Sequence, residues 1–371
     1  MSEWTNLSYA NVATTSPIAH DVAIEWAEKL ARGGAAEFDG EAEKGAMLPL
    51  RKATSDLLSC EVGDVCVGSS ATELLCSLAW AISPGRNSNI VSCKSSFPST
   101  VYPWARVAEA TGAELRLADH DEQLYTDPER LLSLVDEDTS IVTVSHVEFS
   151  TGQRYDLEKI SDAAHSVGAL LIVDATQSMG MLPIDAYRSG ADAIVSSGYK
   201  WLRGTYGAAV GYISPSIVSE MNPGLVGFRS HSDLWDLRAD RLELPVDASR
   251  FEFTTLHFGA ALGLAAAIDE LNEIGIGEVW RHNLALTDLI IEATADLGVG
   301  IASPLAELER SAILSLILPD GVSSVDVARR LQDDYRILVS SRSGLLRVSP
   351  HIDNEKREIE ELVSALKEIM S

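Results

Sequence analysis

The sequence predicts an α/β protein in which helices wrap a mainly parallel sheet, with a second, smaller domain toward the C-terminus. Short apolar runs alternate with longer segments of helical period, which is the pattern of strand–helix–strand units. The runs are almost continuously apolar, as expected for strands that are covered on both faces. With 371 residues and 46% hydrophobic content, the chain is long enough for one large core and one smaller core.

Five apolar runs are the candidate strands of the large sheet. They are 89–93, 140–147, 169–174, 191–197 and 208–213. Between the second and third runs, segment 157–168 carries apolar residues at helical spacing and ends at a glycine. These apolar residues are Leu157, Ile160, Ala164 and Val167. We therefore expect a crossover helix that covers the sheet.

The last third of the chain predicts the smaller domain. A helix rich in small residues follows residue 256, and the stretches SAILSLILP and GLLRVSP supply strands. A closing helix from Asn354 carries an apolar stripe that we interpret as core packing without catalytic meaning. Its residues are Ile359, Leu362, Val363, Leu366 and Ile369. We expect a large domain over 17–255 and a small α+β domain over 256–371, and we expect the N-terminal segment 1–16 to join the small domain.

Charge and composition restrict the partners of this chain. Lys and Arg total 29 against 55 Asp and Glu, and the formal charge of −26 opposes binding to nucleic-acid phosphates or anionic lipid. The N-terminus has no basic start or apolar stretch typical of a signal peptide, and no apolar segment approaches the roughly 18 residues of a membrane span. We expect a cytoplasmic protein without nucleic-acid or membrane partners.

Cysteine and histidine spacing argues against a metal site. The four cysteines lie in apolar context without a CxxC pair, so we expect buried free thiols rather than disulfides or metal ligands. The eight histidines are scattered, and no HExxH motif is present. The sequence therefore predicts no bound metal.

Two polar residues stand where strands of the predicted sheet end. Asp174 closes the run 169–174, and Lys200 follows the run 191–197. Ligands of open parallel sheets bind beyond the carboxyl ends of the strands, so this carboxylate and this amine are expected to face one pocket. Taken singly, Asp174 is also a favoured helix N-cap, and Lys200 is also compatible with a solvated surface amine.

The surroundings of Lys200 favour a chemical role. Glycines at 198, 204 and 207, together with Tyr199 and Trp201, predict a tight, enclosed loop. Desolvation in such a loop lowers the pKa of a lysine from its usual value of about 10.4. The neutral amine that results is the nucleophile required for Schiff-base chemistry.

Four segments follow one another in an order that is typical of a known family. They are SSAT followed by ELLCSLAW, then VDATQSMG, ADAIVSSGYKWLRGTYG and LLRVSPHIDNEKREIEELVSAL. Together they resemble the class V aminotransferase family of enzymes that depend on pyridoxal 5'-phosphate, and the resemblance extends over nearly the whole chain. The family includes cysteine desulfurases, isopenicillin N epimerase-like proteins, kynureninases and small-substrate transaminases. The fold that the resemblance implies is fold type I of the pyridoxal-phosphate enzymes.

The resemblance implies roles for three residues at the cofactor ring. Lys200 matches the lysine that binds the cofactor as a Schiff base and then moves the proton at the substrate Cα. Asp174 matches the aspartate that pairs with the pyridine nitrogen and keeps it protonated, so that the ring draws charge from the Cα carbanion. Gln177 matches the residue that hydrogen-bonds the phenolic oxygen of the cofactor.

The resemblance also implies a cradle for the cofactor phosphate. Ala71 and Thr72, which open a helix after GSSAT, resemble the backbone and hydroxyl donors of that cradle, and Ser197 matches a serine three residues before the lysine. Thr255 resembles a threonine that reaches the phosphate of the neighbouring subunit, which implies a homodimer with shared sites. Each of these residues, taken alone, is better explained by ordinary helix or turn capping.

Several positions depart from the desulfurase pattern. Phe97, expected to stack on the cofactor face, and Tyr199, beside the lysine, both stand where desulfurases carry histidine. Phe149 replaces an asparagine that contacts the cofactor in relatives. The interval LVSSRSGLLR contains no cysteine that could accept sulfur. These departures indicate the epimerase-like and lyase-like branches rather than persulfide transfer.

Arginines are the candidates for binding the substrate. Arg347 matches the residue whose planar fork clamps the substrate α-carboxylate. Arg342 is a second substrate-binding candidate, and Arg154 and Arg229 are weaker candidates for a second anionic group. Surface or salt-bridged roles are the alternative for these three.

The function we infer from the resemblance is that of a lyase that removes a β- or γ-substituent from the side chain of a small L-amino acid, giving an unsaturated or keto-acid product and ammonia. The first alternative is transfer of the amino group to a 2-keto acid, and the second is epimerisation at Cα. A third alternative is a catalytically inactive binding protein with the same fold. Nicotinamide chemistry is disfavoured because no GxGxxG follows a first strand.

Overall fold

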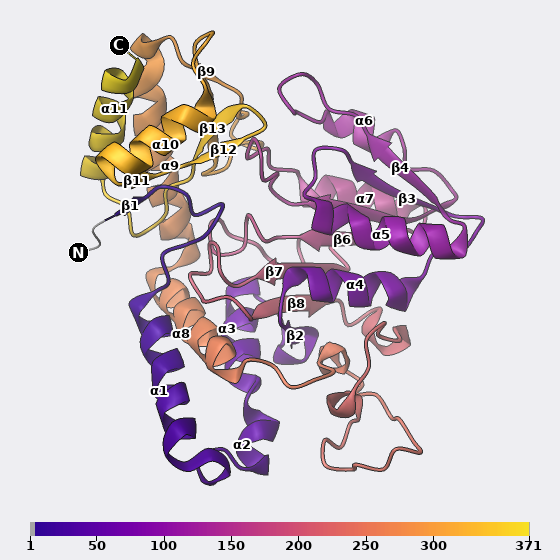
Figure 1. The fold of residues 1–371 in the computed structure, drawn as a ribbon. Helices are drawn as coiled ribbons and strands as arrows, with labels where there is room; N and C mark the ends of the chain where they lie inside the picture. Colours follow the sequence, from indigo (N-terminus) through magenta and orange to yellow (C-terminus); the bar gives the residue numbers. More distant parts are fainter. Residues whose placement is uncertain (1–3, 371) are drawn as a thin grey trace.

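The computed structural model describes residues 4–370, and a seven-stranded sheet forms its centre (Figure 1). The strand order is β2-β8-β7-β6-β5-β3-β4. The strands are β2 (Val65–Gly68), β3 (Asn89–Cys93), β4 (Glu114–Ala118), β5 (Thr139–Ser145), β6 (Leu170–Asp174), β7 (Ala193–Ser197) and β8 (Ala209–Ile213). Only β8 runs antiparallel to its neighbours β2 and β7, so the mainly parallel sheet expected from the sequence is confirmed.

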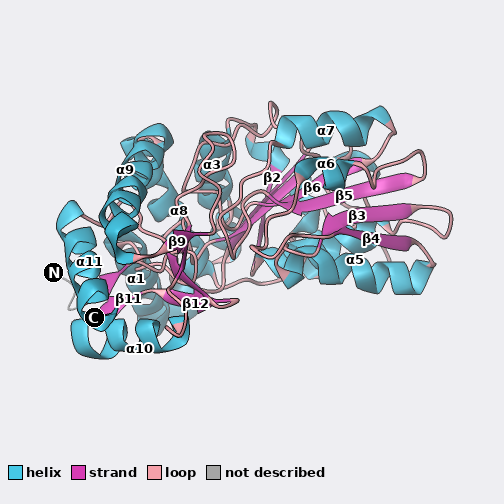
Figure 2. Cartoon of the chain, turned by 90° about the horizontal axis from the view of Figure 1, so that it is seen from above, coloured by secondary structure: helices cyan, strands magenta, loops and turns pink. Residues whose placement is uncertain are grey.

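Helices cover both faces of this sheet. Figure 2 shows α5 and α7 on opposite sides of the strands. Within β5, Ile141 packs in the core on the α4 and α5 side, whereas Val142 packs in the core that includes α3 and α7. Each strand therefore buries successive residues in two different cores, which explains why its sequence is apolar without alternation. The helices of this part are α2 (Gly40–Gly45), α3 (Leu48–Leu58), α4 (Ala71–Ile82), α5 (Pro98–Thr111), α6 (Pro128–Leu132) and α7 (Leu157–Ser166).

Two long helices lie side by side at one end of the large sheet, α1 (Pro17–Gly33) and α8 (Phe258–Ile274) (Figure 1). Small residues allow this close packing. A Cβ added at Gly263 of α8 would lie 2.6 Å from the carbonyl oxygen of Ala19 in α1, so any larger residue would push the helices apart.

The smaller part of the chain contains a four-stranded antiparallel sheet of order β12-β13-β10-β9. Its strands are β9 (Gly300–Ile301), β10 (Leu314–Ile317), β12 (Ser340–Arg342) and β13 (Leu345–Val348), and its helices are α9 (Ile276–Thr294), α10 (Ser324–Tyr335) and α11 (Lys356–Met370). The N-terminal strand β1 (Thr5–Asn6) pairs in parallel with β11 (Ile337–Leu338), so the start of the chain joins this part. The stripe of α11 packs into its core, as expected.

The positions of the predicted elements agree closely with the structure. The five apolar runs form β3, β5, β6, β7 and β8, although β5 ends at Ser145 and residues 146–147 lie beyond it. The helix expected over 157–168 is α7, which ends at Ser166, and Val167 follows it as the C-cap. The division at 255/256 remains a prediction. The buried residues of α8 pack with the large sheet, and this packing favours a boundary after Ile274.

No helix among residues 4–370 is both long enough and apolar enough to cross a membrane.

Candidate active site

A pocket opens at the carboxyl ends of β6 and β7, where the N-termini of α4 and α5 also meet. Its volume is about 420 Å³ with the open mouth included. Eight of the residues expected at the site line this pocket: Ala71, Thr72, Phe97, Asp174, Gln177, Ser197, Tyr199 and Lys200. Phe149, which stands where relatives carry an asparagine, also lines it. Sequence reasoning did not single out four further lining residues: Ser99, Ser145, Val147 and Thr176.

Lys200 lies in a tight turn directly after β7. The backbone N–H of Gly204 donates to the carbonyl of Gly198 at 2.8 Å and closes the turn. A Cβ at Gly198 would lie 2.9 Å from the carbonyl oxygen of Ala208, so only glycine fits there. Lys200 is 8% exposed. Burial lowers its pKa to about 8, with the nearby charge of Asp174 raising it in part, so the expected desolvated amine is present.

Aromatic rings surround the Lys200 amine. Its Nζ lies 5.5 Å from the ring centroid of Phe97 and 5.7 Å from that of Tyr199. Phe97 meets Phe149 edge to face, with centroids 5.3 Å apart, and it is 41% exposed at the pocket rather than buried in the core. Tyr199 stacks on Tyr206 with centroids 4.4 Å apart. The rings make this wall of the pocket apolar and favour desolvation of the amine.

Asp174 is the last residue of β6, and both of its carboxylate oxygens are held. Oδ2 accepts a hydrogen bond from Thr100 Oγ1 at 3.0 Å, and Oδ1 accepts one from the backbone N–H of Thr176 at 2.9 Å. The second bond is the local turn contact typical of aspartate. No helix begins at this point, because residues 176–181 form turns. The carboxylate is therefore buried, oriented and directed to the pocket.

Gln177 has protein partners for both ends of its amide. Its Nε2 donates to the carbonyl of Ala10 at 2.8 Å, and its Oε1 accepts from Trp201 Nε1 at 2.8 Å. One N–H of the amide is left for a ligand, because a glutamine carries two such donors. The contact with Ala10 brings the N-terminal segment to the site, and no sequence motif signalled that contact.

Hydroxyl groups and a helix N-terminus form the other end of the pocket. The backbone N–H of Ala71, the first residue of α4, donates to Ser197 Oγ at 3.2 Å, and Thr72 Oγ1 donates to Ser99 Oγ at 2.9 Å. The N-terminus of a 12-residue helix with hydroxyls beside it attracts an anion through its dipole and the N–H groups of its first turn.

Two arginines lie on the β12–β13 side of the small sheet. Arg347, on β13, is 1% exposed, and its guanidinium donates to the carbonyl of Phe149 and to Ser340 Oγ. Burial and the charge of Arg342 lower the Arg347 pKa to about 9. Arg342 donates to Asn11 Oδ1 at 2.9 Å. Neither arginine forms an ion pair with a carboxylate of residues 4–370, and neither lines the pocket of about 420 Å³.

Three other candidates lie away from this pocket. Arg154 donates to the carbonyls of Leu308 and Glu307, and Arg229 donates to the carbonyl of Glu43. These contacts favour the salt-bridged or structural alternative for both arginines. Thr255 is exposed and does not line the pocket of its own chain.

The chain is similar to known proteins over almost its whole length. It is 27% identical to a probable cysteine desulfurase of Methanothermobacter thermautotrophicus, over 97% of this chain and 94% of the relative. It is 29% identical to a kynureninase of Pseudomonas fluorescens, over 67% of this chain and 60% of that relative.

Solved structures establish the fold. The apo cysteine desulfurase of Thermococcus onnurineus NA1 superposes with a TM-score of 0.88 at 24% identity, covering 99% of this chain and 95% of that chain. A cystine C–S lyase in complex with its product cysteine persulfide gives a TM-score of 0.90 at 20% identity, covering 98% of this chain and 97% of that chain. The expected fold type I is confirmed. Because the model of the family described as "Aminotransferase class-V" matches residues 32–362, this chain belongs to the class-V aminotransferase family.

Proposed function

We propose that this protein is a pyridoxal-phosphate-dependent lyase that removes a β- or γ-substituent from the side chain of a small L-amino acid. The observation that carries the proposal is one pocket that holds a desolvated lysine amine, an oriented aspartate and a helix N-terminus. Membership of the class-V aminotransferase family makes the chain a pyridoxal-phosphate enzyme; the reaction type and the residue roles below are our proposals.

The polar residues of the pocket fit three of the polar groups of pyridoxal phosphate. Lys200 offers a buried amine for the aldehyde, and Asp174 offers a fixed carboxylate for the ring nitrogen. The hydroxyls of Thr72 and Ser197 and the N-terminus of α4 match a phosphate.

Residues that line the pocket are assigned separate roles in the reaction. When bound, the cofactor supplies an electron-withdrawing ring that stabilises negative charge at the substrate Cα. Lys200 holds the cofactor before substrate arrives and then removes the Cα proton, for which a pKa of about 8 suits a base near neutral pH. Asp174 keeps a proton on the ring nitrogen, and one N–H of Gln177 is left to bond the phenolic oxygen. Phe97, which lines the pocket, would pack against the bound cofactor and exclude water from it.

Substrate recognition is assigned to the two arginines. Arg347 is a buried guanidinium without a carboxylate partner among the described residues, and such a group favours a bound anion. We assign the α-carboxylate of the substrate to it. Arg342 contributes a second positive charge nearby and is assigned to the same carboxylate or to a second anionic group.

A lyase is favoured over the alternatives by the relatives and by the hairpin between β12 and β13. Relatives named as cysteine desulfurases and a structure named as a cystine C–S lyase support cleavage of a side-chain bond. The hairpin with its turn at Ser343 and Gly344 contains no cysteine, so it offers no thiol that could accept sulfur. A relative from Bacillus subtilis named as an uncharacterized aminotransferase keeps transamination as the second candidate.

The proposed working form is a homodimer in the cytoplasm. Exposed aromatic side chains at the pocket and beside it support this assembly, since a second chain would cover them; they include Phe97, Tyr102 and Tyr206. Exposed Thr255 would then reach the phosphate of the neighbouring subunit.

The proposal is tested by incubating the protein, loaded with pyridoxal phosphate, with L-amino acids that carry β- or γ-leaving groups. Ammonia and the released group are measured with and without a 2-keto acid. A lyase releases both products without keto acid. Turnover that requires keto acid and yields a new amino acid would identify a transaminase. Loss of optical activity alone would identify an epimerase, and no turnover on a broad panel would favour the inactive binding protein.

A further inference from the structure

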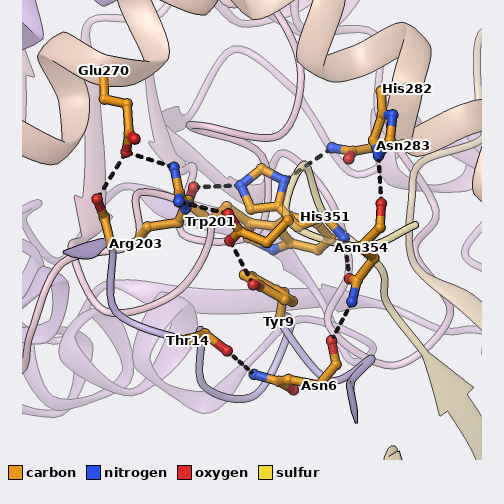
Figure 3. A network of polar contacts seen from close by, with 12 residues as sticks. Asn6, Tyr9, Thr14, Trp201, Arg203, Glu270, His282, Asn283, His351 and Asn354 are labelled. Carbon is orange, nitrogen blue, oxygen red and sulfur yellow. Dashed lines mark hydrogen bonds and ion pairs between the residues drawn. The ribbon is translucent and has the colours of Figure 1, made fainter. Parts of the chain in front are cut away.

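Arg203 lies three residues after Lys200 and connects three parts of the chain (Figure 3). Its side chain is 4% exposed. Nη1 donates to Glu270 Oε2 of α8 at 2.8 Å, and Nη2 donates to Asp353 Oδ1 of the small domain at 2.6 Å. One guanidinium therefore bridges two carboxylates that stand on separate elements.

The backbone of Arg203 is as constrained as its side chain. Its φ is 58°, in the left-handed region that long side chains such as arginine rarely adopt. Its N–H donates to the carbonyl of Lys200 at 2.9 Å, and its carbonyl accepts from the N–H of Ser16 at 2.8 Å. The turn that presents Lys200 thus closes on Arg203.

Residues 351–353, which include the Arg203 partner Asp353, also contact Trp201 in the same turn. His351 Nε2 lies 2.9 Å from the carbonyl oxygen of Trp201, and Asp353 Oδ2 accepts from the Tyr9 hydroxyl at 2.7 Å. Figure 3 shows Tyr9, Trp201, Arg203 and His351 together in this network. Residues 351–353 begin four positions after Arg347. The lysine turn and the strand that carries Arg347 therefore share one set of anchors.

We propose that Arg203 is a positioning residue, which holds the Lys200 turn in register with the small-domain segment that carries Arg347. This inference rests on the proposed function, because it assigns Lys200 to cofactor attachment. The two ion pairs hold the turn in its left-handed conformation, and that conformation sets where the Lys200 amine stands. The placement of the amine matters because a misplacement of about 1 Å can reduce a rate by about 100-fold.

The test separates the guanidinium from the backbone conformation. Asparagine tolerates positive φ, so Arg203→Asn keeps the turn accessible while it removes both ion pairs. Arg203→Lys keeps a charge but loses the fork, and Asp353→Asn removes one partner. Arg116→Gln is the matched control, because Arg116 also bonds two carboxylates, Glu114 and Asp136, at the far edge strand β4.

The readout is the rate at which the apoprotein attaches pyridoxal phosphate to Lys200, followed by absorbance and confirmed by borohydride trapping and peptide mass spectrometry. We expect Arg203→Asn to slow attachment by about 10-fold or more and Asp353→Asn to slow it less. We expect the double variant with Arg203→Asn and Asp353→Asn to attach the cofactor no more slowly than Arg203→Asn alone. The rate of Arg203→Lys should lie between those of Arg203→Asn and the unmodified protein. In turnover assays kcat should fall more than KM rises. A purely structural role would lower the melting temperature and leave the attachment rate unchanged.

Two failures remain distinguishable. Attachment by Arg203→Asn at the wild-type rate overturns the positioning role while the proposed function stands. If the unmodified protein attaches no pyridoxal phosphate at Lys200, the proposed function fails and the inference fails with it. Should Arg203→Asn not fold, Asp353→Asn decides, since it retains the guanidinium and its pair with Glu270; an unchanged rate in that variant also overturns the role.

Discussion

The indole Nε1 of Trp201 donates a hydrogen bond of 2.8 Å to the side-chain oxygen of Gln177, and this bond joins the loop after β6 to the turn after β7. Gln177 stands three residues after Asp174, and Trp201 follows Lys200 directly. Asp174 and Lys200, which are both assigned to the cofactor, are thus connected through Gln177 and Trp201. The geometry of the site depends on this bond as well as on the residues that face the pocket.

Trp201→Phe removes the indole N–H donor and leaves the buried side-chain oxygen of Gln177 without this hydrogen bond. We expect the free energy of unfolding to fall by about 2–4 kcal/mol, from the unsatisfied acceptor and the smaller ring in a fully buried site. Urea denaturation measures this loss. Trp80→Phe is the control, since Trp80 is partly exposed and its loss should be within about 0.5 kcal/mol. Equal losses in the two variants would contradict the structural role of the bond.

Attachment of pyridoxal phosphate to the apoprotein should depend on pH through the Lys200 amine. Because burial lowers the pKa of Lys200 to about 8, the rate should rise with pH to a midpoint near 8 and then level off. Asp174→Asn removes the negative charge that raises this pKa, so its midpoint should lie at lower pH. Stopped-flow absorbance gives both profiles. A midpoint above pH 10 in the unmodified protein would show that the amine is not desolvated.

Arg347→Gln tests the assignment of the substrate carboxylate. Loss of the charged fork should raise KM for the amino-acid substrate by about 10–100-fold, the equivalent of about 1.5–3 kcal/mol for hydrogen bonds to a charged group. The absorbance of the bound cofactor should be unchanged. Arg154→Gln, which alters an arginine outside the pocket, should leave KM as it is. A large rise in KM in both variants would indicate a general effect on the fold.

Glu148→Gln tests a buried carboxyl that lies behind the pocket wall, where it accepts from Ser96 Oγ at 2.9 Å. Burial raises its pKa from 4.5 to about 7. Between these values the folded chain keeps a proton that the unfolded chain has lost, so the stabilising contribution of Glu148 decreases as pH rises from about 4.5 to about 7. The variant should therefore gain stability relative to the unmodified protein across that range, by about 3 kcal/mol at pH 8.

Chemical denaturation at a series of pH values measures the Glu148→Gln effect. Glu137→Gln, at an exposed glutamate, is the matched control and should show no such gain. A Glu148→Gln gain that is the same at every pH would contradict the raised pKa and point to a packing effect.

Sequence patterns predicted the strands that form the site with high accuracy. Residues such as Ile141 and Val142 are buried in different cores, and this two-sided burial leaves a continuous apolar run that is easy to recognise. Asp174 and Lys200 were identified because strand ends of parallel sheets gather at one edge. The edge strand β4, with half-exposed residues such as Arg116, lacks that signal and was not predicted.

The contacts between distant segments could not be predicted. Gln177 meets Ala10, and Arg203 meets Asp353, across separations that no local periodicity encodes. Thr100 and Thr176, which hold the two oxygens of Asp174, look like ordinary polar residues in the sequence because their role arises only from packing. For the same reason, the sequence could not show which arginine binds the substrate. The backbone partners of Arg154 and Arg229 favour structural roles for these two residues.

The central claim is that Lys200 is the residue that attaches pyridoxal phosphate. It is tested most directly by loading the apoprotein with pyridoxal phosphate, reducing with borohydride, and mapping the modified peptide by mass spectrometry, with Lys200→Ala and the exposed-site variant Lys159→Ala treated alongside. We predict a stoichiometric adduct at Lys200 in the unmodified protein and in Lys159→Ala, and none in Lys200→Ala. An adduct on another lysine, or an equal adduct in Lys200→Ala, would contradict the account.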